Sequence, residues 1–226
     1  MSWNLSFFLG LLLLISLLAI RISTILPGSR NAKSRTKRSA SDTCSVAVFL
    51  GSGGHTSEAL TLMSALDFKR YNKRIYIVSD GDILSARKAL NFEAFRGEDP
   101  NLCSILSIPR ARKVHQSLLS TPISTLYSLA FCVYHLTLPP LLTSGQSSFA
   151  DVLILNGPGT CFVLCVAVYV NKFLGLPAPK LIYVETFARV KALSLSGKLI
   201  RPIADRFVTQ WGDSRQQEVS SSRWLV

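Results

Sequence analysis

Acidic residues are scarce and unevenly placed in this chain of 226 residues. It contains 13 Asp and Glu against 25 Lys and Arg, and none of the acids lies within residues 1–38. The six cations of that segment supply half of the formal net charge of +12, so residues 39–226 are only moderately basic. This balance gives no reason to expect a nucleic-acid partner. Because 48% of the residues are hydrophobic, a chain that is disordered throughout is excluded.

Other absences exclude whole classes of site. The five cysteines are scattered with no spacing typical of zinc, so we expect free thiols, with Cys161 and Cys165 on one helix face. No G-x-S-x-G elbow occurs, so nothing supports a serine hydrolase. Gly197-Lys198 is the only Gly-Lys pair and Leu199 follows it, which excludes a P-loop. The length excludes two full domains.

The N-terminus is apolar and uncharged from residue 1 to 20. About 20 such residues cross a bilayer as a helix, so we predict a transmembrane anchor over residues 3–22. A cleaved signal peptide has its positive charges before the apolar run, whereas here they follow it. Those cations should stay in the cytosol, which predicts a single-pass anchor with a cytosolic soluble domain. The anchor includes Leu5, Leu11, Leu14 and Ile20.

Residues 23–43 are rich in Gly, Pro, Ser, Lys and Arg. This composition predicts a basic linker, either a plain tether or a segment that lies against anionic lipid headgroups.

Residues 44–211 alternate between strand and helix patterns. Short β-branched runs bounded by helical segments predict a parallel sheet with helices on both faces, and therefore one α/β, Rossmann-like lobe. A tail over residues 212–226 completes the chain. We expect strands at 44–50, 74–79, 104–108, 151–155, 180–184 and 206–209.

Residues 118–142 differ from the rest because they carry no formal charge but contain prolines and many hydroxyls. Three interpretations stay open for this segment. It is a helix buried in the domain, a surface helix that dips into the bilayer interface, or a second transmembrane helix.

Two glycine-rich turns each follow a predicted strand. Their residues are Gly51, Ser52, Gly53, Gly54, His55 and Thr56 in the first turn and Asn156, Gly157, Pro158, Gly159 and Thr160 in the second. Glycine lets backbone N–H groups approach an oxyanion closely, and a helix N-terminus favours negative charge. Both turns should open at the edge of the sheet where ligands bind, so a diphosphate is the natural ligand. A tight turn without any ligand has the same pattern.

The acids of Asp80-Gly81-Asp82 have two interpretations. Two carboxylates on one short turn are suited to a hard cation. We favour the simpler alternative, in which Asp82 is a helix N-cap and Asp80 is the polar end of a strand.

His55 and Glu185 are the candidate proton carriers. His55 stands inside the first glycine turn, where an imidazole is suited to take a proton from a hydroxyl. Glu185 ends the strand at 180–184, at the same expected edge. Cations and hydroxyls follow it, among them Arg189 and Lys198, which are suited to gripping phosphates. An ordinary charged surface helix explains them equally well.

The segments VFLGSGGHTSE, VSDGD, LNGPGTC, YVETFARVKALSLSGKL and ADRFVTQW follow in one order. Together they resemble the membrane-anchoring subunits of the UDP-N-acetylglucosamine transferase of asparagine-linked glycosylation, over about residues 1–211. The resemblance implies the acceptor-side half of a split GT-B glycosyltransferase, whose soluble catalytic partner binds UDP-GlcNAc. The implied reaction adds the second GlcNAc to GlcNAc-diphospho-dolichol on the cytosolic face of the endoplasmic reticulum. It also implies no cofactor and argues against a metal at Asp80 and Asp82.

The same resemblance implies roles for single residues. The loop Gly51–Thr56 would hold the lipid diphosphate, helped by Gly157–Thr160 and by Arg189 or Lys198. His55, or otherwise Glu185, would be the general base on the acceptor 4-hydroxyl. Docking of the partner is expected at the apolar end of an otherwise polar tail, at Trp224, Leu225 and Val226.

Two other functions stay open. The first is a membrane-anchored oxidoreductase that uses a dinucleotide, which Thr56 disfavours because the fingerprint has glycine at that position. The second is a scaffold that recruits the partner and touches no substrate.

Overall fold

A computed structural model describes residues 2–27, 42–112, 116–117, 119–142, 148–189 and 192–209. The helices are α1 (Ser2–Ile25), α2 (Gly54–Ser64), α3 (Ile83–Arg96), the 3-10 helix η3 (Pro100–Leu102), α4 (Thr121–Leu142), α5 (Thr160–Leu174) and α6 (Leu195–Ile200). The strands are β1 (Ser45–Leu50), β2 (Lys73–Ser79), β3 (Cys103–Ile108), β4 (Val152–Asn156), β5 (Lys180–Val184) and β6 (Arg206–Val208).

The strands form one parallel sheet in the order β3-β2-β1-β4-β5-β6. This order confirms the predicted Rossmann-like lobe. All six expected strands are present, and no strand end differs from the predicted one by more than one residue.

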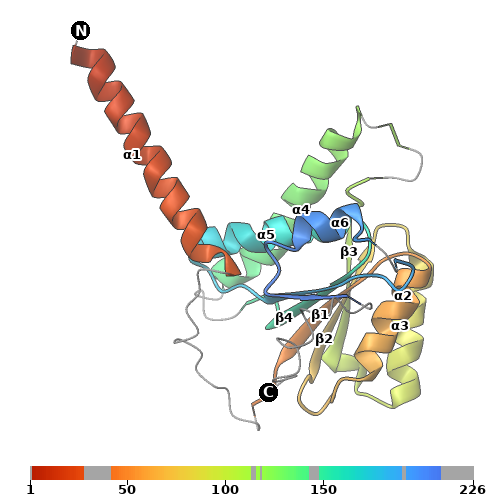
Figure 1. Ribbon diagram of the computed structural model, residues 1–226. Coiled ribbons are helices and arrows are strands. Elements are labelled where there is room, and N and C mark those ends of the chain that lie inside the picture. The colour runs from red at the N-terminus through yellow and green to blue at the C-terminus, as the bar shows by residue number, and fades with distance from the viewer. Residues whose placement is uncertain are drawn as a thin grey trace.

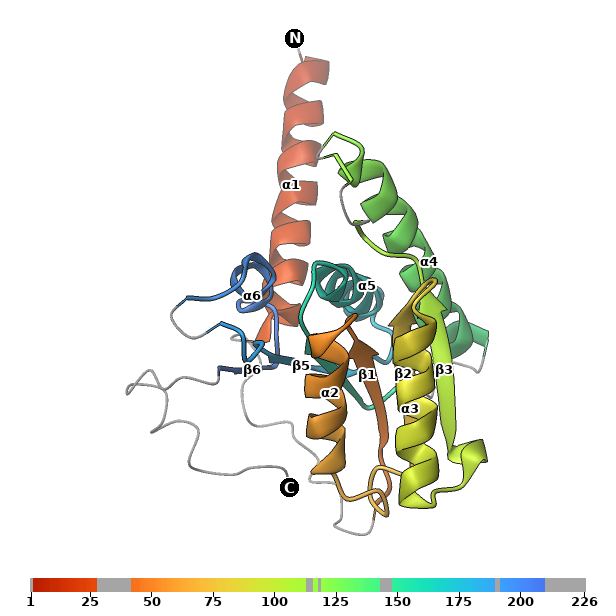
Figure 2. The ribbon, with the colours of Figure 1, turned by 90° about the vertical axis from the view of Figure 1, so that its right-hand side faces the viewer.

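Alternating side chains of β1 divide the core into two layers. Val46, Val48 and Leu50 point to the face that α2 and α3 cover. Ala47 and Phe49 point to the opposite face, which α4, α5 and α6 cover. Successive strand residues point to opposite faces, so an uninterrupted apolar run such as VAVFL is typical of a strand buried on both sides. Figure 2 shows α2 and α3 side by side on one face of the sheet.

Helix α1 projects away from the sheet (Figure 1). Within the described part of the chain, one helix is long and apolar enough to cross a membrane. This helix is α1, and its apolar stretch is Ser6–Ile25. The side chains of Leu11, Leu14 and Ile20 are exposed, as a lipid-facing helix requires. The side chain of Leu5 lies outside the described part.

The C-terminal end of α1 contacts the α/β domain directly. The Arg21 guanidinium donates hydrogen bonds to the carbonyl oxygens of Lys172 and Phe173, at distances of 2.8 to 3.0 Å. These carbonyls belong to the last turn of α5, where a cation also complements the helix dipole. The helix ends at Ile25, which is buried. We had expected the linker to begin at residue 23, so the helix continues into the predicted linker.

Helix α4 answers the question left open for residues 118–142 only in part. Its buried side, which includes Cys132 and Leu136, packs against α5 and the sheet. Its other side exposes Ile123, Leu126 and Tyr127. Among the described helices, α4 does not meet the criteria for a membrane span. The helix is thus half buried in the domain and carries an apolar outer face.

All five cysteines are free thiols, as predicted, and Cys161 and Cys165 share the buried side of α5. Burial raises the pKa of the Cys132 thiol to about 12 and that of Cys165 to about 12. A thiol must ionise to act as a nucleophile, so these groups serve packing instead.

A buried ion pair supports the β2 side of the fold. Arg74 on β2 is fully buried, and its Nε lies 2.8 Å from Oε1 of Glu93 on α3. Tyr76 also donates to Glu93, and the Arg74 guanidinium stacks over the Phe68 ring at 4.4 Å. Glu98 contributes a longer contact of 3.7 Å from a partly exposed position.

Removal of Glu93 should therefore destabilise the domain strongly. In Glu93→Ala the buried charge of Arg74 loses its partner, and we expect a loss of about 3–5 kcal/mol in the free energy of unfolding. Chemical unfolding of the full chain in detergent, followed by circular dichroism, measures this loss. Glu98→Ala is the matched control and should cost less than about 1 kcal/mol. Equal losses in the two variants would contradict a dominant role for the Arg74–Glu93 pair.

Candidate functional site

The candidate site lies where the strand order reverses. β1 and β4 are neighbours at the centre of the sheet, and they lead into helices on opposite faces, α2 and α5. In open α/β sheets this switch point forms a crevice at the carboxyl ends of the strands. The two glycine turns, at 51–54 and 157–159, therefore lie side by side. In Figure 2 strands β1, β2 and β3 run upward, toward the side to which α1 and the start of α4 extend.

The helices at the switch point begin without a capping side chain. The N-cap of α2 is Gly53, with a φ of 69°, and that of α5 is Gly159. By contrast, Asp82 caps α3 and Ser194 caps α6 through hydrogen bonds to backbone N–H groups. The first-turn N–H groups of α2 and α5 thus lack a side-chain acceptor from their N-caps. On α5 the N–H groups of Cys161 and Phe162 donate to the carbonyl oxygens of Pro158 and Gly159 at 2.9 and 3.1 Å, so the N–H groups suited to an anion are those of α2 and of the very start of α5.

His55 fits between the two turns. A Cβ atom at Gly157 would lie 2.7 Å from the ring atoms Cγ and Nδ1 of His55, and a Cβ atom at Gly51 would lie 2.8 Å from the His55 Cβ. Real Cβ contacts are longer than these values, so both positions require glycine while the ring keeps this place. The His55 side chain remains 31% exposed, which leaves it accessible from the crevice.

Two polar residues lie behind His55. Its Nδ1 lies 3.0 Å from Oδ1 of Asn156, the last residue of β4, and 3.9 Å from Oε2 of Glu58 on α2. The Asn156 amide donates to Glu58 Oε2 at 2.9 Å, and Thr186 donates to Glu58 Oε1 at 2.8 Å. Sequence reasoning missed Glu58 as part of the site. A carboxylate three residues after a histidine on one helix is the signal that was available.

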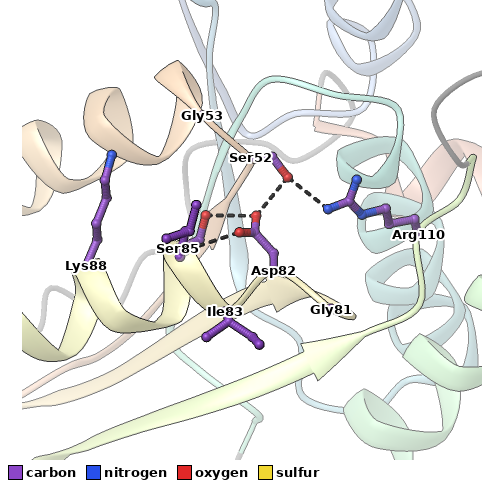
Figure 3. A pocket seen from close by; sticks show the side chains of 9 residues that line it. Ser52, Gly53, Gly81, Asp82, Ile83, Ser85, Lys88 and Arg110 are labelled. Carbon is purple, nitrogen blue, oxygen red and sulfur yellow. Dashed lines mark hydrogen bonds between the residues drawn. The ribbon is translucent and has the colours of Figure 1, made fainter.

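A second cluster supports the first glycine turn from the β2 side (Figure 3). Ser52 donates to Asp82 Oδ2 at 2.7 Å, and Arg110 donates to the Ser52 hydroxyl at 3.1 Å. Asp82 also accepts from the backbone N–H of Ser85 at 3.1 Å, which confirms its interpretation as an N-cap. An open cleft of about 330 Å³ adjoins this cluster, and Lys88 also lines it.

The Asp82 carboxylate is held ionised. Partial burial alone raises the pKa of this carboxyl, but the hydrogen bonds from Ser52 and Ser85 and the charge of Arg110 outweigh burial, so the pKa lies below its ordinary value. Asp82 therefore orients Ser52 and the start of α3. The contact of Arg110 with the first glycine turn was not predicted from the sequence.

The two threonines of the glycine turns face the protein. Thr56 is buried, and its hydroxyl donates to the Gly51 carbonyl oxygen and lies 2.6 Å from the Ser85 hydroxyl. Thr160 is also buried and accepts from the backbone N–H of Ala111 at 3.3 Å. Both threonines were predicted to hold a diphosphate. In the structure their side chains instead hold the turns in shape through hydrogen bonds within the protein.

Glu185 is fully buried. Its Oε2 accepts from the backbone N–H and the hydroxyl of Ser194 at 3.0 and 3.1 Å, and its Oε1 accepts from the Thr186 N–H at 3.2 Å. A Cβ atom at Gly197 would overlap Oε2. This carboxylate therefore ties the segment after β5 to α6, and the geometry favours a positioning role over that of a base.

The remaining predicted site residues are exposed or lie outside the described part. Arg189 and Lys198 are exposed beyond the carboxyl end of β5, and Lys198 is on α6. Trp224, Leu225 and Val226, predicted to dock a partner, fall outside the described residues.

A methyl group added at Gly157 should displace His55 and strain the turn. The φ of Gly157 is 106°, a conformation that residues with a Cβ atom rarely adopt. We expect Gly157→Ala to lower the free energy of unfolding by about 1–3 kcal/mol. Gly159→Ala is the control, because its φ is −55° and a Cβ there meets no atom within 4 Å. Chemical unfolding measures both, and equal midpoints would contradict the crowding at Gly157.

Comparison with known proteins matches this chain to the family model described as "Oligosaccharide biosynthesis protein Alg14 like" over residues 46–225. A relative from Cryptococcus neoformans, named UDP-N-acetylglucosamine transferase subunit ALG14, is 46% identical over 96% of this chain and 93% of its own length. Proteins of the same name from Schizosaccharomyces pombe and Homo sapiens are 44% and 38% identical. These matches cover 74% of this chain and 75% of the S. pombe protein, and 75% of this chain and 76% of the human protein. The chain therefore belongs to the Alg14-like family.

Proposed function

We propose that this chain is the acceptor-binding, membrane-anchored subunit of a UDP-GlcNAc transferase that makes the lipid-linked precursor of N-glycans. The acceptor is GlcNAc-diphospho-dolichol, and the product carries a second GlcNAc. A soluble catalytic partner supplies the UDP-GlcNAc site. The domain structure supports this division, because residues 44–209 provide one Rossmann-like lobe whereas a GT-B enzyme has two.

One observation carries the proposal. Two helices with glycine N-caps start side by side at the switch point, and the imidazole of His55 lies between their turns. The N–H groups and helix dipoles favour the diphosphate of the acceptor. The exposed cations Arg189 and Lys198, together with Arg110, add positive charge at the same edge of the sheet.

His55 then serves as general base. It takes the proton of the acceptor 4-hydroxyl while that oxygen forms a bond to C1 of the donor GlcNAc. The bond between C1 and the β-phosphate oxygen of UDP-GlcNAc breaks, and UDP leaves on the partner's side. The chain contributes no activity alone, because the donor site belongs to the partner.

Helices α1 and α4 fit a place at the cytosolic face of the endoplasmic reticulum. Both extend to the side of the molecule that the carboxyl ends of the strands face (Figure 2). We assign α1 to the membrane span and the exposed face of α4 to the bilayer interface, since an apolar outer face on a half-buried helix suits that depth. The diphosphate of a membrane-bound lipid would then lie near the glycine turns.

The family relationship favours this function over the two alternatives. The relatives named above are transferase subunits, which gives a dinucleotide-dependent oxidoreductase no support. A pure scaffold explains the anchor and the partner, but leaves the two helices with glycine N-caps and the partly exposed histidine between their turns without a role.

The proposal predicts transfer only in a mixture of the two chains. GlcNAc transfer from UDP-GlcNAc to a GlcNAc-diphosphoryl lipid is measured for this chain, for its catalytic partner and for both together. We expect turnover in the mixture alone. Turnover by this chain alone would refute the division into two lobes.

Replacement of His55 separates the transferase subunit from the scaffold. His55→Ala should lower kcat of the complex by about 10²-fold or more, because the general base is lost, while the two chains still co-purify. Arg189→Ala should mainly raise KM for the acceptor. A scaffold would tolerate both changes, so unchanged kinetics in both variants would contradict acceptor binding by this chain.

The outer face of α4 should strengthen attachment to lipid. Ile123→Ser and Leu126→Ser together should reduce the fraction of α1-truncated chain that floats with vesicles of neutral and anionic phospholipids. Phe95→Ser is the control, because Phe95 is also a large apolar residue and is 93% exposed on α3, on the other face of the sheet. Equal flotation of all variants would contradict an interfacial role for α4.

A further inference from the structure

A hydrogen-bonded set of three side chains includes the partly exposed imidazole of His55 and extends from it into the protein. It runs from His55 Nδ1 to Asn156 Oδ1 at 3.0 Å, and from Asn156 Nδ2 to Glu58 Oε2 at 2.9 Å. The members come from different elements, because His55 and Glu58 lie on α2 and Asn156 ends β4. The other oxygen of Glu58 accepts from Thr186, just beyond β5, at 2.8 Å.

The carboxylate of Glu58 determines which atom donates and which accepts in each hydrogen bond of this set of side chains. An ionised carboxylate only accepts hydrogen bonds, so the Asn156 group that faces it is the NH₂. The Asn156 oxygen therefore faces His55, and an amide oxygen also only accepts. It follows that Nδ1 of His55 carries a proton. In the neutral ring the second nitrogen, Nε2, is then unprotonated and available as a base.

Burial keeps this arrangement from turning. Asn156 is fully buried, and the side chain of Glu58 is only 16% exposed. Both oxygens of Glu58 have a donor, so rotation of the carboxylate would break a hydrogen bond to Asn156 or to Thr186. The ring itself is confined by the backbones of Gly51 and Gly157.

We propose that Asn156 and Glu58 are positioning residues that hold His55 in the Nδ1-protonated tautomer, with Nε2 as the proton acceptor. This inference rests on the proposed role of His55 as general base. Neither residue has to touch the substrate. Asn156 orients the ring, and Glu58 fixes which end of the Asn156 amide the ring meets. Thr186 holds Glu58 in place.

Nitrogen NMR tests the tautomer without any activity. The full chain is prepared in detergent with ¹⁵N-labelled histidine; it has three histidines, and the His55 signals are identified by their absence in His55→Gln. With the ring neutral, we expect Nδ1 at the shift of a protonated nitrogen and Nε2 at that of an unprotonated one. Asn156→Ala should move the shifts toward a mixture of tautomers or their reversal. Unchanged shifts in Asn156→Ala would overturn the proposal.

A paired substitution protects the test against a variant that merely fails to fold. In Glu58→Gln an amide faces Asn156, so Asn156 is no longer forced to turn its oxygen toward the ring, which should disrupt the chain of hydrogen bonds. The double variant Glu58→Gln with Asn156→Asp restores it, because the new amide at position 58 donates to one oxygen of the new carboxylate at position 156, and the other oxygen accepts from Nδ1. We expect the double variant to regain the Nδ1-protonated pattern that Glu58→Gln loses. Failure to regain it, in a protein with native circular dichroism, would also overturn the proposal.

Kinetics of the complex with the catalytic partner provide the functional measurement. Asn156→Ala should lower kcat by roughly 10²-fold, as a wrong tautomer does in other histidine bases, with KM for UDP-GlcNAc unchanged. The double variant should recover at least a tenth of the wild-type kcat. Ser57→Ala, an exposed neighbour on the same helix, is the control and should retain full activity.

The outcomes separate the inference from the function on which it rests. If His55→Gln retains full turnover, His55 is not the base and the proposed function loses its mechanism, whatever the NMR result. If His55→Gln is inactive but Asn156→Ala keeps both turnover and nitrogen shifts, the base is right and the positioning role is wrong.

Discussion

The close approach of two backbones to one imidazole is the constraint on which the site depends. His55 has room because neither Gly51 nor Gly157 carries a Cβ atom, and these glycines belong to turns after different strands. The two turns meet only because β1 and β4 are adjacent, which in turn requires the crossover that places β2 and β3 on the other side of β1. The position of His55 thus depends both on the order of the strands and on the presence of glycine in the two turns.

Polar side chains at the carboxyl edge of the sheet divide into those that shape the site and those that remain accessible. The side chains of the first group hydrogen-bond to the turns and helix starts around them. They are Thr56, Thr160, Asp82 and Glu185. What stays open to a ligand is mostly backbone N–H, one imidazole and a few exposed cations. An edge of this kind is suited to a negatively charged group through backbone geometry and positive electrostatic potential, rather than through a dense set of side-chain contacts.

The fold was predictable from the sequence because its signals are local. Runs such as VAVFL and DVLIL, each followed by a glycine turn and an apolar helix, indicate the α/β alternation without any knowledge of distant residues. The pairing of Asn156 with Glu58 was not predictable in this way, since 98 positions separate them. Residue type was equally uninformative for Glu185, because a carboxylate at a strand end fits a base or a buried anchor, and only its donors distinguish the two. The outer face of α4 was left open for a similar reason, since its apolar residues point both into the core and away from it.

The bond between Arg21 and the end of α5 changes how the domain relates to a membrane. A flexible tether limits only the greatest distance that a domain can reach, and leaves its orientation free. A membrane-spanning helix that is hydrogen-bonded to the domain also fixes its orientation. The tilt of the helix then sets the height and the angle of the sheet's carboxyl edge above the lipid. Under the proposed function, the lipid acceptor is confined to one depth and would meet the crevice in a single orientation, so its search would be reduced to diffusion in a plane.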